Sequence, residues 1–292
     1  MLSWYINPTT DSKFHDIGRT EMDQLTKTRL EPTLVAPETF LIHDHQGEGS
    51  APVSVALNTL VIRAAEPAVV DTGVAENREQ YLADVFGLVE PADVRWVFLS
   101  HDDRDHSGNL LAVLDACPNA TLLTNWFSIG RMADEWMTPV PRCRFLNEGD
   151  RIDVGDRTLV AVRPPVYDNP TTRGLFDTRT GAFWAVDTFA TPVPVAMERL
   201  DDLDDDAFVD GQRLGAKLIA PWHEWLDEQR FVRHVEAVRS LPISVAASAH
   251  APAIGGTQLD RAFDLLRELP SAAPWSPFTQ DDLELWLSVP PH

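Results

Sequence analysis

The sequence predicts an α/β protein in which two mixed β-sheets pack face to face and helices cover their outer faces. Short apolar runs separated by Gly, Ser and Pro begin near residue 40, as is typical of a β-meander. Strand and helix patterns then alternate, and a second round of strands and helices begins near residue 142. Each round can build one sheet with its own helices, so two rounds predict two packed sheets.

The first round of elements spans residues 40–136. A helix is predicted over 76–87 because Tyr81, Leu82, Val85 and Phe86 recur at helical spacing. The apolar run within 94–100 indicates a strand that is buried on both faces. The expected strands are 40–45, 53–63, 67–71, 94–100 and 120–124, and the expected helices are 76–87, 107–117 and 125–136.

The second round contains more turn signals. Glu148-Gly149-Asp150 and Gly155-Asp156 divide residues 142–165 into three predicted strands, and Thr180-Gly181 marks a hairpin over 173–187. The remaining expected elements are an acidic, partly helical insertion (198–212), a helix (228–241), a strand (242–250) and a last helix (257–269).

No internal repeat, low-complexity tract or long linker divides the chain. We therefore expect one domain over residues 36–270. Residues 1–35 are expected to form an N-terminal extension with a short helix near Glu21–Arg29. Residues 271–292 are expected to form a tail that docks on the domain through Trp275 and Trp286.

Composition narrows the classes of function. The chain has 292 residues, 44% hydrophobic residues, nine Trp and a formal net charge of −21, which disfavours binding to nucleic acid or to an anionic membrane. Two cysteines cannot form a disulfide scaffold. The N-terminus lacks the pattern of an export signal, and no apolar run is long enough to span a membrane, so we expect a cytoplasmic protein. Nucleotide-binding and serine-hydrolase motifs are also absent from the sequence.

The run S-H-D-D-R-D-H-S-G after the buried strand is the main candidate site. His101, Asp103 and Asp105 alternate, and His106 follows at once. Charged side chains past the carboxyl end of a strand point into the crevice where α/β proteins bind ligands. A cation would neutralise them, so one short loop could supply two ligands to each of two metal ions. The alternative is a solvated, acidic helix cap.

These residues carry a resemblance to a known family. S-H-D-D-R-D-H-S-G-N resembles the H-x-[H/E]-x-D-H signature of the metallo-β-lactamase fold, and Asp71-Thr72-Gly73 resembles the Asp-Thr-Gly that precedes it. The resemblance implies the αββα sandwich of that fold. An acid at Asp103 makes the chain similar to the flavodiiron and oxygen-binding di-iron branch, which has Glu there.

The resemblance continues over about residues 38–268 and implies a ligand set. Residues 164–170, 185–190 and 248–254 resemble the segments of that branch that supply its remaining ligands, which here are Asp168, Asp187 and His250. The chain departs from the branch at Asp103, one methylene shorter than Glu, and at Asp168, which stands where the branch has His. The implied ligands are His101, Asp103, Asp168 and Asp187 for metal 1, and Asp105, His106, Asp187 and His250 for metal 2.

Four carboxylates and three imidazoles without a thiolate suit iron or manganese better than zinc. We therefore expect two metal ions, preferably iron, with manganese or zinc as alternatives. The flavodoxin domain of flavodiiron proteins is not expected in this chain, which implies that it binds no flavin and needs an external electron donor. The candidate catalytic residues are Asp105, Asp187 and Tyr167; Tyr167 either donates a proton near the metals or only packs.

The sequence leaves three functions open. The first is a di-iron oxidoreductase or oxygenase that reacts with dioxygen or nitric oxide. The second is a metal-dependent hydrolase of an ester, thioester, lactone or phosphoester, in which the metals activate a water molecule. The third is a non-catalytic oxygen sensor. We expect the protein to act on a small molecule, either an organic substrate or dioxygen or nitric oxide. Whether it forms a homodimer is left open. His43 and His45 are expected to be surface or pocket-lining residues, and Asp71 a buried structural carboxylate.

Overall fold

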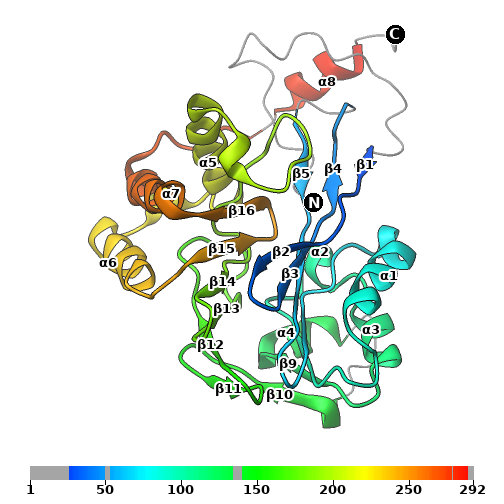
Figure 1. The fold of residues 1–292 in the computed structure, drawn as a ribbon. Helices are drawn as coiled ribbons and strands as arrows, with labels where there is room; N and C mark the ends of the chain where they lie inside the picture. The colour runs from blue at the N-terminus through cyan, green and yellow to red at the C-terminus, as the bar shows by residue number, and fades with distance from the viewer. Residues whose placement is uncertain (1–25, 50–52, 134–139, 278, 289–292) are drawn as a thin grey trace.

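The computed structural model describes residues 26–49, 53–133, 140–277 and 279–288. Two large mixed sheets face each other, and helices cover both outer faces (Figure 1). This arrangement confirms the predicted αββα sandwich.

The first sheet has seven strands in the order β10-β9-β8-β7-β6-β3-β2. Neighbours from β7 to β10 run parallel, whereas the other pairs are antiparallel. The strands are β2 (Thr33–Ala36), β3 (Thr39–Ile42), β6 (Thr59–Ile62), β7 (Ala68–Val70), β8 (Trp96–Phe98), β9 (Thr121–Thr124) and β10 (Cys143–Phe145). The helices of this half are α1 (Arg78–Leu88), α2 (Arg104–Ser107), α3 (Leu110–Ala116) and α4 (Trp126–Met132).

The second sheet has six strands in the order β11-β12-β13-β14-β15-β16. Its strands are β11 (Arg151–Asp153), β12 (Thr158–Val162), β13 (Gly174–Asp177), β14 (Ala182–Trp184), β15 (Val245–Ser248) and β16 (Ala251–Gly255). It is covered by α5 (Asp205–Ile219), α6 (Glu228–Arg239) and α7 (Gly256–Glu268). Part of the acidic insertion starts α5, because the Asp204 carboxylate accepts a hydrogen bond from Ala207 N at 3.0 Å and caps the helix.

Smaller elements complete the fold. A three-stranded sheet joins β1 (Lys27–Thr28), β4 (His45–Gln46) and β5 (Val55–Ala56), and α8 (Gln280–Ser288) lies near the end of the chain. The 3-10 helices are Ala75–Asn77, Val140–Arg142, Leu200–Asp202, His223–Trp225 and Leu269–Ser271. None of the helices within the described ranges combines the length and the apolarity that crossing a bilayer requires.

Three apolar clusters hold the four layers together. Side chains such as Phe98, Leu123 and Trp184 fill the space between the two sheets. Val97 lies in the cluster that packs against α1 and α3, and Phe183 in the cluster that packs against α5, α6 and α7. Successive strand residues therefore enter opposite cores, which explains why these strands are apolar at consecutive positions.

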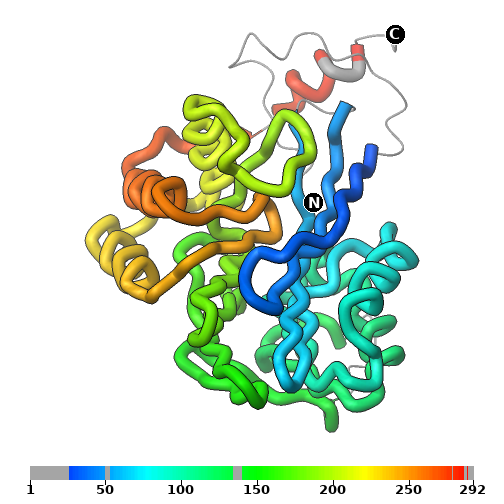
Figure 2. Tube along the Cα trace, in the orientation of Figure 1, coloured from blue at the N-terminus to red at the C-terminus, as the bar shows by residue number. Residues whose placement is uncertain are grey.

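Each sheet comes from one half of the chain. The seven-stranded sheet is built from residues 33–145 and the six-stranded sheet from residues 151–255. Figure 2 shows the two halves side by side, with the blue-to-cyan half against the green-to-orange half. A site that takes residues from both halves therefore depends on how the sheets pack.

Several local expectations are wrong. The strands expected over 40–45 and 53–63 are each broken, into β3 and β4 and into β5 and β6. The helix expected near Glu21–Arg29 lies mostly outside the described residues, and in its described part Lys27–Thr28 is β1, which pairs with His45–Gln46. The strand expected over 242–250 ends at Ser248, and the unexpected β16 follows and pairs back on it. The predicted start of the domain at residue 36 falls at the end of β2. Strands β1 and β16 form because they pair with segments distant in the sequence or with a neighbouring strand, and local periodicity does not report such pairing.

Helix α5 packs closely on the loop that follows β14. A Cβ atom at Gly215 would overlap the carbonyl group of Ala190, and one at Gly211 would lie 2.7 Å from Thr191 Cγ2. These glycines therefore let the helix backbone approach the loop that carries Asp187.

We predict that Gly215→Ala lowers the free energy of unfolding by about 1–3 kcal/mol or more, because the helix must move away from backbone atoms. Gly87→Ala in α1 is the matched control, since a Cβ there meets no atom within 4 Å; it should stabilise by about 0.5–1 kcal/mol. Urea denaturation measures both. Equal unfolding midpoints for the two variants would contradict this packing.

Candidate metal centre

The loop that follows β8 forms the first half of the candidate site. It leads into α2, whose first turn is closed by His106 N and Ser107 N donating to Asp103 O at 3.0 and 2.9 Å. Asp103 stands at the N-cap, yet its carboxylate accepts no capping hydrogen bond from the helix. The carboxylate is therefore available to the cluster, and the helical turn brings Asp105 and His106 to the same place.

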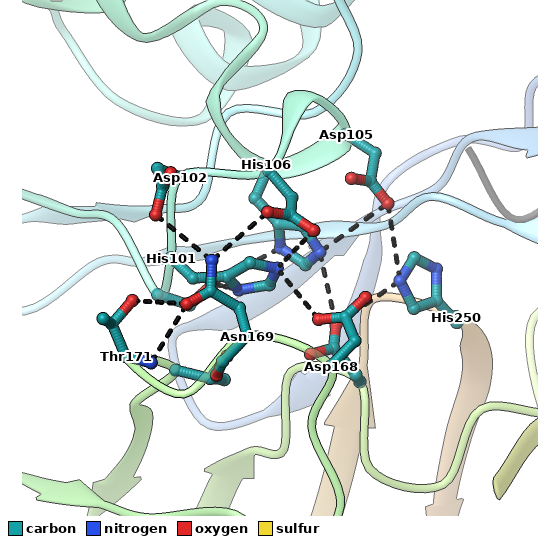
Figure 3. Close-up of polar contacts among 12 residues, drawn as sticks. His101, Asp102, Asp105, His106, Asp168, Asn169, Thr171 and His250 are labelled. Atoms are coloured by element: carbon teal, nitrogen blue, oxygen red, sulfur yellow. Dashed lines mark hydrogen bonds and ion pairs between the residues drawn. The ribbon is translucent and has the colours of Figure 1, made fainter. Parts of the chain in front are cut away.

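Three loops of the second sheet complete the site. Asp168 lies between β12 and β13, Asp187 follows β14, and His250 lies between β15 and β16. Figure 3 shows Asp168 and His250 next to His101, Asp105 and His106. All three loops leave the sheet at the end that faces the β8 loop.

The position of Asp187 depends on strained backbone. Val186, just before it, has φ 56°, a conformation that is costly for a β-branched residue. Its carbonyl oxygen accepts hydrogen bonds from Ser248 Oγ at 2.7 Å and Ala249 N at 2.8 Å. The end of β15 thus holds this turn and also carries His250, so Asp187 and His250 are fixed together.

Seven side chains converge with short distances between imidazole nitrogens and carboxylate oxygens. These join His101 Nε2 to Asp103 Oδ2 (3.9 Å) and Asp168 Oδ1 (3.8 Å), His106 Nε2 to Asp105 Oδ2 (3.7 Å) and Asp187 Oδ1 (3.3 Å), and His250 Nε2 to Asp105 Oδ2 (3.5 Å) and Asp187 Oδ1 (3.4 Å). Two donors that each lie about 2.1 Å from one ion are roughly 3 to 3.5 Å apart. The spacing is thus close to that of a shared ion.

Three buried donor atoms of this cluster make no hydrogen bond within the described part of the chain. His106 Nε2 and both carboxylate oxygens of Asp187 are buried and make no hydrogen bond with any described residue. The side chain of Asp187 is 0% exposed and that of His106 is 1% exposed. A buried carboxylate without hydrogen bonds is costly. A metal ion would satisfy these atoms, so the residues present fit a metal site.

Contacts on the outer side of each imidazole fix its orientation. His250 Nδ1 donates to Ala56 O at 3.0 Å, and His106 Nδ1 donates to Asp71 Oδ2 at 3.0 Å. Ser100 Oγ donates to Asp71 Oδ2 and can therefore accept from His101 Nδ1, 3.1 Å away. In each neutral ring Nε2 then carries the lone pair and faces the cluster, which is the arrangement typical of metal-binding histidines.

The ionisation of the cluster shows its need for positive charge. Burial opposes a charge on Asp187, but His101, His106 and His250 outweigh it and hold the pKa of this carboxyl well below its usual range. Burial likewise opposes a charge on His106, but Asp105 and Asp71 raise its pKa above the usual value. Burial, together with Asp187, raises the pKa of Asp168 to about 6. The shifts of Asp187 and His106 both show that the carboxylates of the cluster favour positive charge at this place, which a cation would bring.

The structure brings together all seven residues singled out from the sequence as ligands. Asp71 is a buried structural carboxylate, as expected. Tyr167 lies beside Asp168 in the chain, but its ring packs against Trp222, with 6.1 Å between the two ring centroids. The Arg163 guanidinium carbon lies 6.0 Å from the centroid of the Tyr167 ring. Its role as a proton donor stays a prediction.

Sequence reasoning missed two residues that support the site. Trp184 Nε1 donates to Asp71 Oδ2 at 3.0 Å, and Asn169 Nδ2 donates to the carboxylates of Asp102 and Asp103. Asn169 stands next to Asp168, which is the one sequence signal that could have drawn attention to it. Trp184 had no such signal, since its partner lies 113 residues earlier.

His43 and His45 lie outside this cluster and are buried, with exposures of 2% and 0%. His43 lines a cavity of about 100 Å³ with Asp44 and Tyr81, which agrees with the pocket-lining alternative for this residue. His45 Nδ1 lies 3.4 Å from Ser54 Oγ. Burial lowers the pKa of each imidazole to about 4, so both rings are neutral near neutral pH.

The buried ring of His45 predicts a pH dependence of stability. Because its pKa is about 4 when folded and about 6.5 when unfolded, the unfolded chain takes up the proton first as the pH falls. Between pH 8 and pH 5, the free energy of unfolding of the unchanged protein should fall by about 2 kcal/mol more than that of the His45→Gln variant. Urea denaturation of both proteins at each pH measures this difference. Parallel pH curves for the two proteins would show that the ring is not buried as a neutral group.

We predict that Asp71→Asn lowers the free energy of unfolding by about 2–3 kcal/mol, since one carboxylate oxygen that accepts buried hydrogen bonds becomes an NH₂ group. Asp201→Asn, at a carboxylate whose side chain is 47% exposed, is the control and should stay within about 0.5 kcal/mol of the unchanged protein. Urea denaturation of the metal-free protein measures both. If both variants lost the same free energy of unfolding, the hydrogen bonds of Asp71 would not stabilise the protein as proposed.

Comparison with known proteins gives relatives that include diflavin flavoproteins and nitric oxide reductase flavorubredoxins. The chain is 30% identical over 133 residues to a putative diflavin flavoprotein A 2 from Nostoc sp., covering 45% of this chain and 23% of that protein. It is 20% identical over 195 residues to an anaerobic nitric oxide reductase flavorubredoxin from Pectobacterium atrosepticum, covering 66% of this chain and 38% of that protein. The chain thus spans well under half the length of these two relatives.

A similar fold occurs in the rubredoxin oxygen:oxidoreductase from the anaerobe Desulfovibrio gigas. The TM-score is 0.71 at 15% sequence identity, over 84% of this chain and 62% of that chain. The model of the ODP family beta lactamases matches residues 55–251, which is more than half of the chain and includes every residue of the cluster. The chain therefore belongs to the ODP family of beta-lactamase-fold proteins.

Proposed function

We propose that the seven-residue cluster holds two iron ions and that the protein acts as an oxidoreductase on dioxygen or nitric oxide. The observation that carries this proposal is the convergence of four carboxylates and three imidazoles around buried atoms that make no hydrogen bond with any described residue. An arrangement of this kind is unfavourable without cations.

The division of ligands between the two ions follows from how the donor atoms group. One group joins His101, Asp103 and Asp168, and a second joins Asp105, His106 and His250; within each group the atoms lie within 4.8 Å of one another. A third group links His101 and His106 through Asp187. This supports metal 1 in the first group, metal 2 in the second, and Asp187 as the bridge.

The donor set favours iron over zinc, because it is rich in oxygen and has no thiolate. The four negative charges of the carboxylates balance the four positive charges of two divalent ions. With fewer carboxylates, some of that positive charge would be uncompensated in a buried site. When bound, an iron pair can supply electrons to a diatomic molecule. Asp187 would hold both ions at one distance from each other, because its turn is fixed by Ser248 and Ala249.

The two sides of the cluster differ in exposure. The side chains of Asp103 and Asp168 are 37% and 38% exposed, whereas those of Asp105 and His250 are 11% and 3% exposed. Solvent therefore reaches the cluster on the side proposed for metal 1, between two carboxylates. Bound ions would balance these two carboxylates, but the chain as a whole has a formal net charge of −21, which disfavours an anionic substrate such as a phosphoester and does not hinder a small neutral molecule. This favours dioxygen or nitric oxide as the substrate.

The names of two similar proteins support the same choice. One is a nitric oxide reductase flavorubredoxin and the other a rubredoxin oxygen:oxidoreductase. This chain matches only part of each, so we propose that the electrons come from a donor outside the matched segment.

Metal analysis tests this function. After anaerobic loading with Fe²⁺ and removal of excess iron, we expect two iron ions per chain and an absorption change on exposure to dioxygen or nitric oxide. Asp187→Asn should bind fewer ions, because the shared ligand loses its charge. Asp201→Asn, which changes an exposed carboxylate paired with Arg199, should match the unchanged protein. Mass spectrometry of the metals and an oxygen or nitric oxide electrode with an external reductant provide the measurements.

Other outcomes identify the alternatives. Stoichiometric zinc, no reaction of the iron-loaded protein with either gas, and an oxygen-independent ester hydrolysis that Asp187→Asn abolishes would make the protein a metallohydrolase. Tight gas binding by the iron-loaded protein without turnover in the presence of reductant would make it a sensor.

A further inference from the structure

We propose that Asn169 is a positioning residue that fixes one oxygen of Asp103, so that Asp103 offers a single oxygen to metal 1. This inference rests on the metal centre proposed above. Asn169 is 3% exposed and belongs to the loop that carries Asp168, from which its amide reaches the β8 loop. Figure 3 shows its amide at the centre of a set of polar contacts.

The hydrogen bonds of Asn169 determine the orientation of its amide. Its Oδ1 accepts from Thr171 N at 3.0 Å and from Thr171 Oγ1 at 2.7 Å. The amide NH₂ group must therefore face the other way, where it donates to Asp103 Oδ1 and Asp102 Oδ1, each at 3.2 Å. Reversing the amide would put its oxygen against two carboxylates and its NH₂ group against the Thr171 donor N–H. Asn169 is thus held as a donor to the acidic loop.

Asp103 has little else to fix it. Its side chain is 37% exposed, and its carboxylate does not cap α2. Asn169 engages Oδ1, and Arg131 Nη2 lies 4.0 Å from the same oxygen. The other oxygen, Oδ2, faces His101 Nε2 at 3.9 Å. One oxygen of Asp103 is therefore directed toward Asn169 and Arg131, and the other toward the position proposed for metal 1.

Asp102 anchors this arrangement to the first half of the chain. Its carboxylate is paired with Arg131 Nε at 2.8 Å and accepts from Ser128 Oγ at 3.3 Å, both in α4. The charge of Asp102 is thereby balanced without a metal ion, and its Oδ1 remains an acceptor for Asn169. Asn169 thus connects two loops from different sheets, and this connection sets where Asp103 lies relative to Asp168.

The role assigned to Asn169 predicts a selective effect on one of two metal sites. Asn169→Asp replaces the donor with a third carboxylate next to Asp102 and Asp103, so it should turn Asp103 away. We expect one of the two sites to weaken by about 10- to 100-fold and the other to keep its affinity. Asn169→Ala, which adds no charge, should weaken the same site less.

Titration with Mn²⁺ measures this effect without any assay of activity. Electron paramagnetic resonance of the unbound ion gives the number and affinity of sites, and urea denaturation of each metal-free protein reports stability separately. Asn119→Asp is the matched control, because Asn119 is an exposed residue whose amide donates to Ala92 O. It should bind Mn²⁺ as the unchanged protein does.

A double variant tests whether Asn169 acts through Asp103. If it does, adding Asn169→Asp to Asp103→Asn should weaken Mn²⁺ binding no further than Asp103→Asn alone, whereas independent effects would add. Two sites of unchanged affinity in Asn169→Asp, or additive losses in the double variant, would overturn the inference. Fewer than two Mn²⁺ sites in the unchanged protein would instead refute the metal centre, and the inference with it.

Discussion

The carboxylate of Asp71 is the interaction on which the site depends. It is fully buried and accepts hydrogen bonds from Ser100 and His106 in the first half of the chain and from Trp184 in the second half. Asp71 itself has φ 55°, so the backbone there is held in a costly conformation. One carboxylate thus joins the two sheets at the place where their loops meet and orients a histidine of the cluster at the same time.

The packing of the two sheets explains why the cluster forms where it does. The β8 loop supplies His101, Asp103, Asp105 and His106, and the loops of the other sheet supply the remaining three members. Neither half holds enough donors for two ions. The charges that would repel one another in an isolated loop become a shared ligand set only when the sheets pack. Stability gained in the apolar core between the sheets therefore offsets the electrostatic cost of assembling the site.

Much of this could be predicted from the sequence, and the exceptions have a common cause. The sandwich followed from apolar runs and turn residues, because both are local properties of the chain. The four residues of the β8 loop were found because they are adjacent, and Asp168, Asp187 and His250 because their segments resemble a known pattern. Trp184 and Asn169 were missed because their partners lie 113 and 66 to 67 residues away. Strands β1 and β16 were missed because each forms by pairing with another strand, which local sequence patterns do not report.

The central claim is that two metal ions lie on either side of Asp187. Crystals of the iron-loaded protein, measured with X-rays at the iron absorption edge, test it most directly. The account predicts two anomalous peaks about 3.5–4 Å apart, with the carboxylate of Asp187 between them. A single peak, or a cluster filled only by water at full iron loading, would contradict it.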